Sequence, residues 1–210
     1  AFFFSSLAYQ SCKSVTVELK HIYRQDNPKF IKILNEIRNN TLSQSSADEL
    51  NKRFIPDFEP SEDSGYISLT THNNKAETTN IAELEKLKGK SQIYNASIEG
   101  KFPEFSFPNK EELILKVGAQ VMFIKNDRSS EKRYFNGKIG KVILLDKEEV
   151  VVKCPGDEFN IITTPESWEN INYTVNTETK AITENKIGSY TQMPLRLAWS
   201  ITIHKSQGLT

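Results

Sequence analysis

The chain has 210 residues, of which 37% are hydrophobic, and its 27 basic side chains balance 27 acidic ones. With a mean hydropathy of −0.51, this composition excludes collagen, a coiled coil and wholesale disorder, and is typical of a globular protein of one or two domains. No apolar stretch approaches the roughly 18–20 residues that span a bilayer, and the apolar opening lacks the basic flank of a signal peptide. We therefore expect a cytosolic or nuclear protein that does not engage a membrane.

The first predicted elements are a strand and two helices. Residues 15–19 alternate apolar and polar side chains with β-branched content, which predicts a short strand. Asp26-Asn27-Pro28 is typical of a helix start, and apolar residues then recur at helical spacing as far as Ile37. A second short helix is predicted over 45–54.

A strand, a turn and a helix come next. The run 65–70 is predicted to be a strand, and 73–87 a helix with Ile81, Leu84 and Leu87 on one face. Strand, turn and helix in this order form the unit of a parallel α/β sheet. We therefore predict an α/β fold for this part of the chain.

From about residue 112 the pattern changes to short β-rich runs, separated by turn signals such as Asn136-Gly137 and Pro155-Gly156. Their spacing predicts a small β-barrel of about 65 residues inserted into the α/β body. The last apolar run, 194–203, is β-capable and returns to the body. The runs assigned to the barrel are 113–117, 118–124, 140–145 and 150–153.

The two cysteines, Cys12 and Cys154, have no CxxC pairing and no histidine cluster nearby. A structural zinc site would therefore have no ligands. We expect two buried, reduced thiols and no bound metal.

Two loops that follow predicted strands of the body carry polar side chains, and open parallel sheets bind ligands at the carboxyl ends of their strands. In the loop 21–25, the guanidinium of Arg24 can reach a phosphate, or it can form a surface salt bridge. In the next loop, Thr71, His72 and Asn73 can hold a backbone phosphate at a helix start. The alternative is plain helix capping by Thr71 or Asn73.

The last loop is the most informative. A buried strand delivers Thr202, His204, Lys205 and Gln207 into a turn, and Gly208 there permits a close backbone approach. Such a cluster can contact a nucleic-acid backbone on one side and a nucleotide on the other. A histidine satisfied within the core is the alternative for His204 taken alone.

Several other chemistries lack their motifs. The sequence has no GxSxG elbow, no HExxH pair and no GxxxxGK[ST] phosphate loop. We therefore do not expect a hydrolase of a familiar type, and this chain alone should not hydrolyse ATP.

Taken in order, the motifs resemble those of superfamily one helicases of the 5′-to-3′ branch, the Pif-type and RecD-like DNA helicases. The run from Pro194 to Thr210 resembles their motif V, and Tyr23-Arg24-Gln25 their Phe/Tyr-Arg-Gln segment. Leu69 to Asn73, followed by Asn80, resembles motif IV. The runs 115–123 and 135–140 resemble the entry into the family's SH3-like barrel insertion.

The resemblance implies the second RecA-like domain of such a helicase, a P-loop NTPase-type fold without the P-loop. This domain would comprise residues 1–116 and 189–210, with the SH3-like β-barrel inserted at 117–188. The parent would be an ATP-dependent 5′-to-3′ DNA helicase whose first RecA-like domain holds ATP and Mg²⁺. The fragment alone would bind neither and would be inactive as an ATPase.

The resemblance also implies roles for individual residues. Arg24 would reach the γ-phosphate as an arginine finger, and Gln207 would couple the nucleotide and DNA sites, so that both are catalytic. Gly208 and Thr210 would lie near the nucleotide. The residues implied to bind DNA are Thr71, His72, Asn73, Thr202, His204 and Lys205.

The implied partners are single-stranded DNA or a duplex fork and the first RecA-like domain of the same chain, in a monomer found in the cytoplasm, at the nucleoid, or in a nucleus or mitochondrion. Two alternatives stay open. One is a nucleic-acid-binding module without motor activity, and the other is a scaffold that keeps only the fold.

Basic residues are concentrated between positions 110 and 141 although the whole chain is neutral. Within this segment, a basic strip can steer single-stranded DNA or can equally be the solvated face of a hairpin. The polar stretch 165–188 matches the family poorly, and we assign it no contact. The basic strip consists of Lys125, Arg128, Lys132, Arg133 and Lys138.

Overall fold

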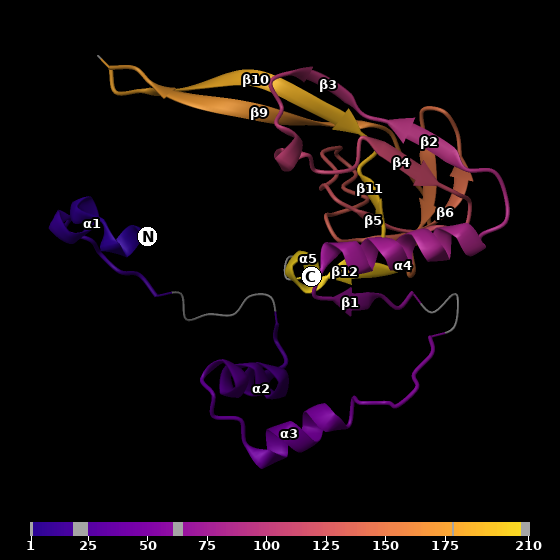
Figure 1. Cartoon of the computed structure of the whole chain (residues 1–210), viewed down its shortest axis with the longest axis horizontal. Helices are drawn as coiled ribbons and strands as arrows, with labels where there is room; N and C mark the ends of the chain where they lie inside the picture. Colours follow the sequence, from indigo (N-terminus) through magenta and orange to yellow (C-terminus); the bar gives the residue numbers. More distant parts are fainter. Residues whose placement is uncertain (1, 19–24, 61–64, 178, 207–210) are drawn as a thin grey trace. The chain divides into compact units, whose positions relative to one another are not determined.

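The computed structural model describes residues 2–18, 25–60, 65–177 and 179–206, with the backbone alone for Lys205 (Figure 1). The chain divides into two compact units, Ala1–Phe58 and Glu59–Thr210. The predicted boundaries at 116/117 and 188/189 are a different division, based on resemblance, and stay predictions.

The described part of the first unit is helical. Asn27 caps α2 by accepting a hydrogen bond from the Phe30 backbone N–H at 3.1 Å, and Pro28 occupies the first turn, as predicted. The strand predicted over 15–19 is wrong for Val15–Glu18, which have no regular secondary structure. Alternation sets which side chains share a face, but a strand also needs a hydrogen-bonding neighbour, and these residues have none among those described. The elements are η1 (Phe3–Ser5), α1 (Leu7–Ser11), α2 (Pro28–Arg38) and α3 (Gln44–Asn51).

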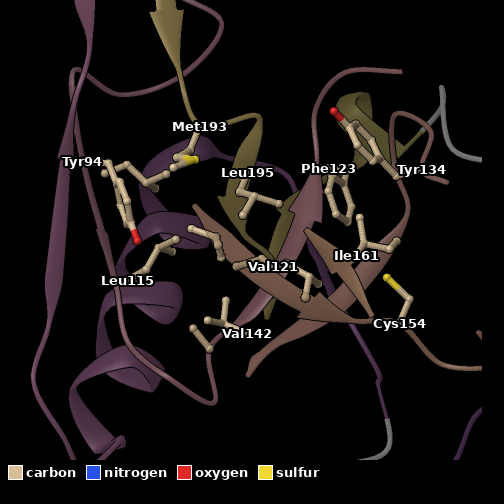
Figure 2. Close-up of a cluster of buried hydrophobic side chains, with 14 of the residues drawn as sticks. Tyr94, Leu115, Val121, Phe123, Tyr134, Val142, Cys154, Ile161, Met193 and Leu195 are labelled. Carbon is tan, nitrogen blue, oxygen red and sulfur yellow. The ribbon is translucent and has the colours of Figure 1, made fainter. Parts of the chain in front are cut away.

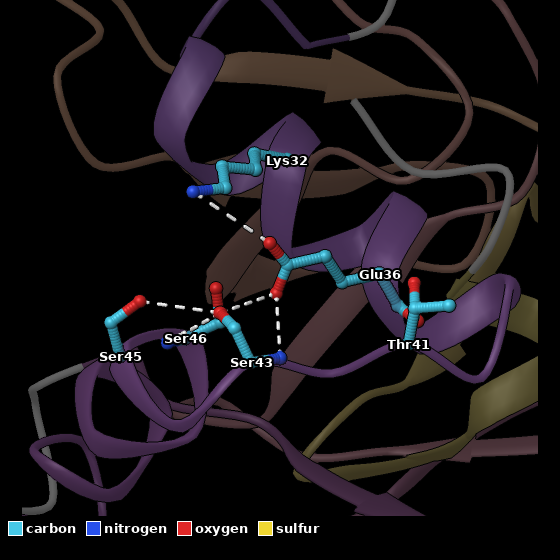
Figure 3. Close-up of polar contacts among 6 residues, drawn as sticks. All are labelled: Lys32, Glu36, Thr41, Ser43, Ser45 and Ser46. Carbon is cyan, nitrogen blue, oxygen red and sulfur yellow. Dashed lines mark hydrogen bonds and ion pairs between the residues drawn. The ribbon is translucent and has the colours of Figure 1, made fainter.

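The Glu36 carboxylate links α2 to the start of α3 (Figure 3), and Lys29 of α2 also pairs with Glu49 of α3 at 3.0 Å. Glu36 accepts hydrogen bonds from the Ser43 backbone N–H at 3.0 Å and from the Ser43 hydroxyl at 2.9 Å, and Lys32 lies 3.7 Å from its other oxygen. Ser43 itself caps α3 by accepting from the Ser46 N–H. Hydrogen bonds from the Ser43 backbone, Ser46 and the Ser43 hydroxyl lower the pKa of Glu36 to about 2.

The second unit contains the predicted strand, turn and helix. β1 (Ser68–Thr70) pairs in parallel with β12 (Ser200–Thr202), α4 (Asn73–Lys86) packs against both strands, and α5 (Ile203–Ser206) follows β12 (Figure 1). The buried face of α4 differs from the predicted face. Leu84 is buried as predicted, but Ile81 is exposed. The residues of α4 that are buried are Ala76, Asn80 and Leu84.

A five-stranded antiparallel sheet holds most of the core (Figure 2). Val121, Phe123 and Leu195 are fully buried in it. The apolar run predicted as one strand over 194–203 divides into two, because β11 joins this sheet whereas β12 joins the parallel pair. The strands, in sheet order, are β11 (Leu195–Leu197), β5 (Gln120–Phe123), β6 (Ile139–Leu145), β7 (Val150–Lys153) and β8 (Ile161–Thr163).

The barrel expected from the sequence is not closed in the part of the chain that the structure describes. β8 and β11 form the two edges of the five-stranded sheet and do not pair with each other. The chain leaves the sheet after β8, because the next strand, β9, pairs with β10 in a different sheet. The observed fold is therefore mixed α/β with an open antiparallel sheet.

The polar stretch 165–188 lies mostly in a long hairpin. β9 (Glu166–Val175) and β10 (Ile182–Gln192) extend far beyond β3 (Ser97–Gly100), which pairs with Gly188–Thr191 near the C-terminal end of β10 (Figure 1). At the root of the hairpin, Trp168 contacts Tyr190 edge-on, with ring centroids 6.2 Å apart. The remaining elements are β2 (Gln92–Asn95), η2 (Glu104–Ser106) and β4 (Glu112–Leu115), and β2 pairs with β4.

Candidate nucleic-acid interface

Two of the polar loops predicted from the sequence follow the carboxyl ends of two neighbouring strands, which form one edge of the second unit's parallel pair. β1 and β12 run in parallel, and Thr70 is the register partner of Thr202. Both strands end at this pair, so Thr71-His72 after β1 and α5 after β12 leave the same edge (Figure 1). This edge is where parallel sheets place their ligands.

The loop after β1 presents exposed donors. Thr71, His72 and Asn73 are all exposed. The Thr71 hydroxyl lies 2.8 Å from the His72 Nδ1 atom, and the Thr70 hydroxyl donates to the His72 carbonyl at 3.1 Å. The two threonines therefore hold the imidazole and the backbone of His72 in place.

The start of α4 has no side-chain cap. The cap position is His72, whose side chain makes no capping hydrogen bond, so the alternative expectation of capping by Thr71 or Asn73 is not what the structure has. The first backbone N–H groups of a helix have no partner within it, and the helix dipole favours an anion beside them. The edge can thus bind a phosphate through backbone groups as well as side chains.

The residues at the end of β12 and after it differ in how much of each is exposed. His204 is exposed, but only 5% of Thr202 is exposed. Thr202 lies within the sheet and has little exposed surface, and its predicted contact with DNA stays a prediction. The side chain of Lys205 is outside what the structure describes. Ser206 donates its hydroxyl to the Ile203 carbonyl at 2.7 Å, which closes the short turn of α5.

The predicted nucleotide-facing residues lie outside the described residues. They are Arg24, Gln207, Gly208 and Thr210. Their predicted roles therefore stay predictions.

No family model matches the chain. Individual proteins do match. The chain is 30% identical over 222 residues to the human ATP-dependent DNA helicase PIF1, covering all of this chain and 32% of that protein. It is 32% identical over 225 residues to the Pif1 helicase of a Psychrobacter species, covering 85% of this chain and 33% of the relative.

Solved structures give the same result. The crystal structure of Bacteroides Pif1 with ADP-AlF4 has a TM-score of 0.80 at 39% identity, over 90% of this chain and 43% of that one. The Bacteroides Pif1 complex with ADP-AlF3 and single-stranded DNA has a TM-score of 0.62 at 39% identity, over 100% and 47%. This chain is homologous to a segment of the Pif1 helicases.

The resemblance found in the motifs is therefore confirmed. The chain spans about a third of the length of the curated Pif1 relatives that it matches. Among Pif1 structures, Candida albicans Pif1 also covers the whole chain, at 30% identity and a TM-score of 0.61.

Two side-chain amides near the edge were not assigned a function from the sequence. In this Pif1 homologue, Asn80 of α4 bonds to both backbone groups of Ser200. Gln120 of β5 donates to the carbonyls of Tyr66, at 3.0 Å, and Ala198, at 2.9 Å. The signals for Asn80 were its match to motif IV and its place between Ala76 and Leu84, at i+4 spacing on the buried face of α4. Gln120 had no comparable signal.

The basic strip is largely neutralised. Lys125 pairs with Glu166 at 2.8 Å and its side chain is only 10% exposed. Lys138 pairs with Asp157 at 2.6 Å, and Arg133 pairs with Glu131. These contacts favour the interpretation as a structural face for Lys125, Arg133 and Lys138. Within the described ranges, only Arg128 and Lys132 of the strip are exposed without an ion pair.

The cysteines differ from each other. Cys154 is buried, and burial raises the pKa of its thiol to about 11. Cys12 is exposed, so the expectation of two buried thiols is wrong for Cys12, which lies next to the five-residue helix α1 of a unit with little core. In the described residues we find no cluster of three His, Cys, Asp or Glu side chains that could hold a metal. No helix in that part is long and apolar enough to cross a membrane.

Proposed function

We propose that this chain is the part of an ATP-dependent 5′-to-3′ DNA helicase that binds the tracking single strand and supplies an arginine finger. The observation that carries the DNA-binding half is the shared edge, where the uncapped start of α4 meets exposed Thr71, His72 and His204. Homology to Pif1 helicases supports the motor half.

DNA binding at this edge would be independent of sequence. The backbone N–H groups at the start of α4, the Thr71 hydroxyl and the two imidazoles can all reach phosphate or sugar, and such contacts do not read bases. Lys205 would add a positive charge from the same loop as His204. Thr202 would act by holding α5 in position, because its side chain is buried.

Two finer features of the fold belong to this proposal. The parallel pair with α4 would be part of a RecA-like domain that includes residues 1–116 and 189–210. β5 to β8, four strands of the five-stranded sheet that is open in the described residues, would form the core of an SH3-like insertion over 117–188, and β11 would join them from the segment 189–210.

For the nucleotide, we propose the roles that the resemblance implies. Arg24 would stabilise charge developing on the transferred phosphate, and Gly208 and Thr210 would lie beside the nucleotide. ATP and Mg²⁺ would be held by another RecA-like domain of a longer chain, which would act as a monomer on single-stranded DNA or a fork. Gln207, between the two ligands, would transmit domain closure to the DNA loops.

ATP hydrolysis by the intact protein tests this proposal. We expect turnover that single-stranded DNA stimulates, and an Arg24→Ala variant that loses turnover by several orders of magnitude but still binds DNA. Binding without turnover in the unmodified protein would point to a binding module without motor activity. Absence of both would leave only a scaffold.

A further inference from the structure

Asn80 occupies the place of a neighbouring strand beside β12. Its side chain is buried, with 8% of the residue exposed. The Asn80 Nδ2 atom donates to the Ser200 carbonyl at 2.8 Å, and the Asn80 Oδ1 atom accepts from the Ser200 N–H at 2.8 Å. One amide side chain thus satisfies both backbone groups of a single residue, as a paired strand would.

Asn80 makes these bonds along the side of β12 that faces away from β1. On the side of β1, the Ser68 N–H donates to the Trp199 carbonyl at 2.8 Å. In a strand, successive residues direct their backbone groups to opposite edges. β12 is therefore held between β1 and the side chain of Asn80.

This arrangement connects the two polar loops. α4 begins at Asn73, about two helical turns before Asn80. β12 ends at Thr202, directly after Ser200 and Ile201. The ladder between β1 and β12 has only three register pairs. So few backbone hydrogen bonds, all on one side of β12, would fix this strand weakly. The amide bonds of Asn80 supply the missing constraint.

We infer that Asn80 is a positioning residue, which sets the spacing between the phosphate-binding start of α4 and the loop after β12. The inference rests on the proposed function. It predicts that loss of the amide loosens the DNA-binding edge more than it loosens the rest of the second unit. A residue that only packs in the core would not have this preference.

Asn109 is a matched control. It is also buried, with 5% exposed, and its Nδ2 atom donates to the carbonyls of Met193, at 3.2 Å, and Leu195, at 2.8 Å. Asn109 therefore holds the same C-terminal segment, but before and at the start of β11 rather than at β12.

The experiment measures DNA-stimulated ATP hydrolysis by the intact protein as a function of oligo(dT) concentration, together with thermal unfolding. For Asn80→Ala, we expect the half-saturating oligo(dT) concentration to rise roughly tenfold, the size of effect that follows when buried backbone groups lose their partners. Turnover at saturating DNA should change little, because no nucleotide contact is altered. Asn109→Ala should lower the unfolding temperature without moving the half-saturating concentration.

Asn80→Asp tests the donor separately. It keeps the acceptor for the Ser200 N–H but places a carboxylate oxygen against the Ser200 carbonyl, so we expect a shift at least as large as for Asn80→Ala. If Asn80→Ala does not fold, Asn80→Ser, which leaves a small polar side chain, is measured in the same way.

Three results would overturn the inference. The first is an unchanged half-saturating concentration in every folded Asn80 variant. The second is an equal shift in Asn109→Ala, which would reduce the effect to general destabilisation. The third is an unmodified protein that neither binds oligo(dT) nor hydrolyses ATP, and this result alone would also overturn the proposed function.

Discussion

Thr70 and Thr202 face each other as the last register pair of β1 and β12, although 132 positions separate them in the sequence. Two loops that are remote along the chain thereby leave the sheet together. The side chain of Thr202 stays inside, and the residues that follow each strand form the exposed edge. The arrangement of this edge leads to the first of four predictions.

Replacing His72 by Ala should weaken binding of single-stranded DNA, by roughly three- to tenfold, because a hydrogen bond to a charged group is lost. Thr71→Val should have a smaller effect of the same sign, since it frees the imidazole that Thr71 orients. Fluorescence anisotropy with labelled oligo(dT) measures both. Thr78→Val is the control, because Thr78 lies on α4 and bonds only to the Asn74 carbonyl among the described contacts. Equal weakening by Thr78→Val would contradict the assignment of the edge.

Acid should loosen the contact between α2 and α3. The pKa of Glu36 is lowered from 4.5 to about 2 by hydrogen bonds from Ser43 and Ser46. Because the folded pKa lies below the unfolded one, the stabilisation is fully present above about pH 4.5 and is lost as the pH falls towards 2. Amide hydrogen exchange of residues 43–46 as a function of pH, corrected for intrinsic exchange, measures it. A Glu36→Gln variant should show a much smaller dependence, because only the ion pair between Glu49 and Lys29 then links the two helices through a carboxylate. A dependence of unchanged size in this variant would assign the effect to another group.

Lys125→Met should destabilise the root of the hairpin. Lys125 pairs with Glu166, donates to the Ser167 carbonyl at 2.6 Å and lies 4.9 Å from the Trp168 ring centroid. Removing one partner of a half-buried ion pair leaves the other uncompensated, and we expect a loss of about 1–3 kcal/mol in the free energy of unfolding. Denaturant unfolding measures this loss. Lys132→Met, at an exposed site, should change stability little, and a larger loss there than in Lys125→Met would refute the assignment.

The two thiols should react at very different rates. Cys12 is exposed, whereas burial raises the pKa of Cys154 to about 11 and covers its sulfur. Reaction with a chromogenic disulfide at neutral pH should therefore label Cys12 rapidly and Cys154 only after unfolding. A Cys12→Ser variant should show no fast phase. Rapid labelling of that variant would mean that Cys154 is accessible.

Local signals in the sequence were sufficient where one short segment decides the structure. Asn27 and Pro28 fixed the start of α2, and the strand, turn and helix around Thr71 gave the parallel pair. Parallel pairing then explains why two of the three predicted loops meet at one edge. Sequence reasoning about the site was therefore most reliable for loops that directly follow a strand.

Structure that depends on remote partners could not be predicted in this way. Val15–Glu18 has the alternation of a strand but no neighbour among the described residues. The hairpin of β9 and β10 is rich in Asn, Thr and Glu, and its pairing is anchored at its root by Trp168 and Tyr190. Thr202 looked like a contact residue in the motif, yet its position within β12 buries it. Each of these outcomes depends on packing that no short window contains.

The strand pairing at the edge also has a consequence for the order of folding. β11 and β12 are separated by only Ala198 and Trp199, but β11 pairs with β5 whereas β12 pairs with β1. The ladder between β1 and β12 closes the longest loop in the second unit, and long-range pairing of this kind is slow because its entropy must be overcome before any contact forms. The five-stranded sheet can assemble earlier and bring residue 197 close to its final place. The surface proposed to grip DNA should therefore be the last part of this unit to form during refolding.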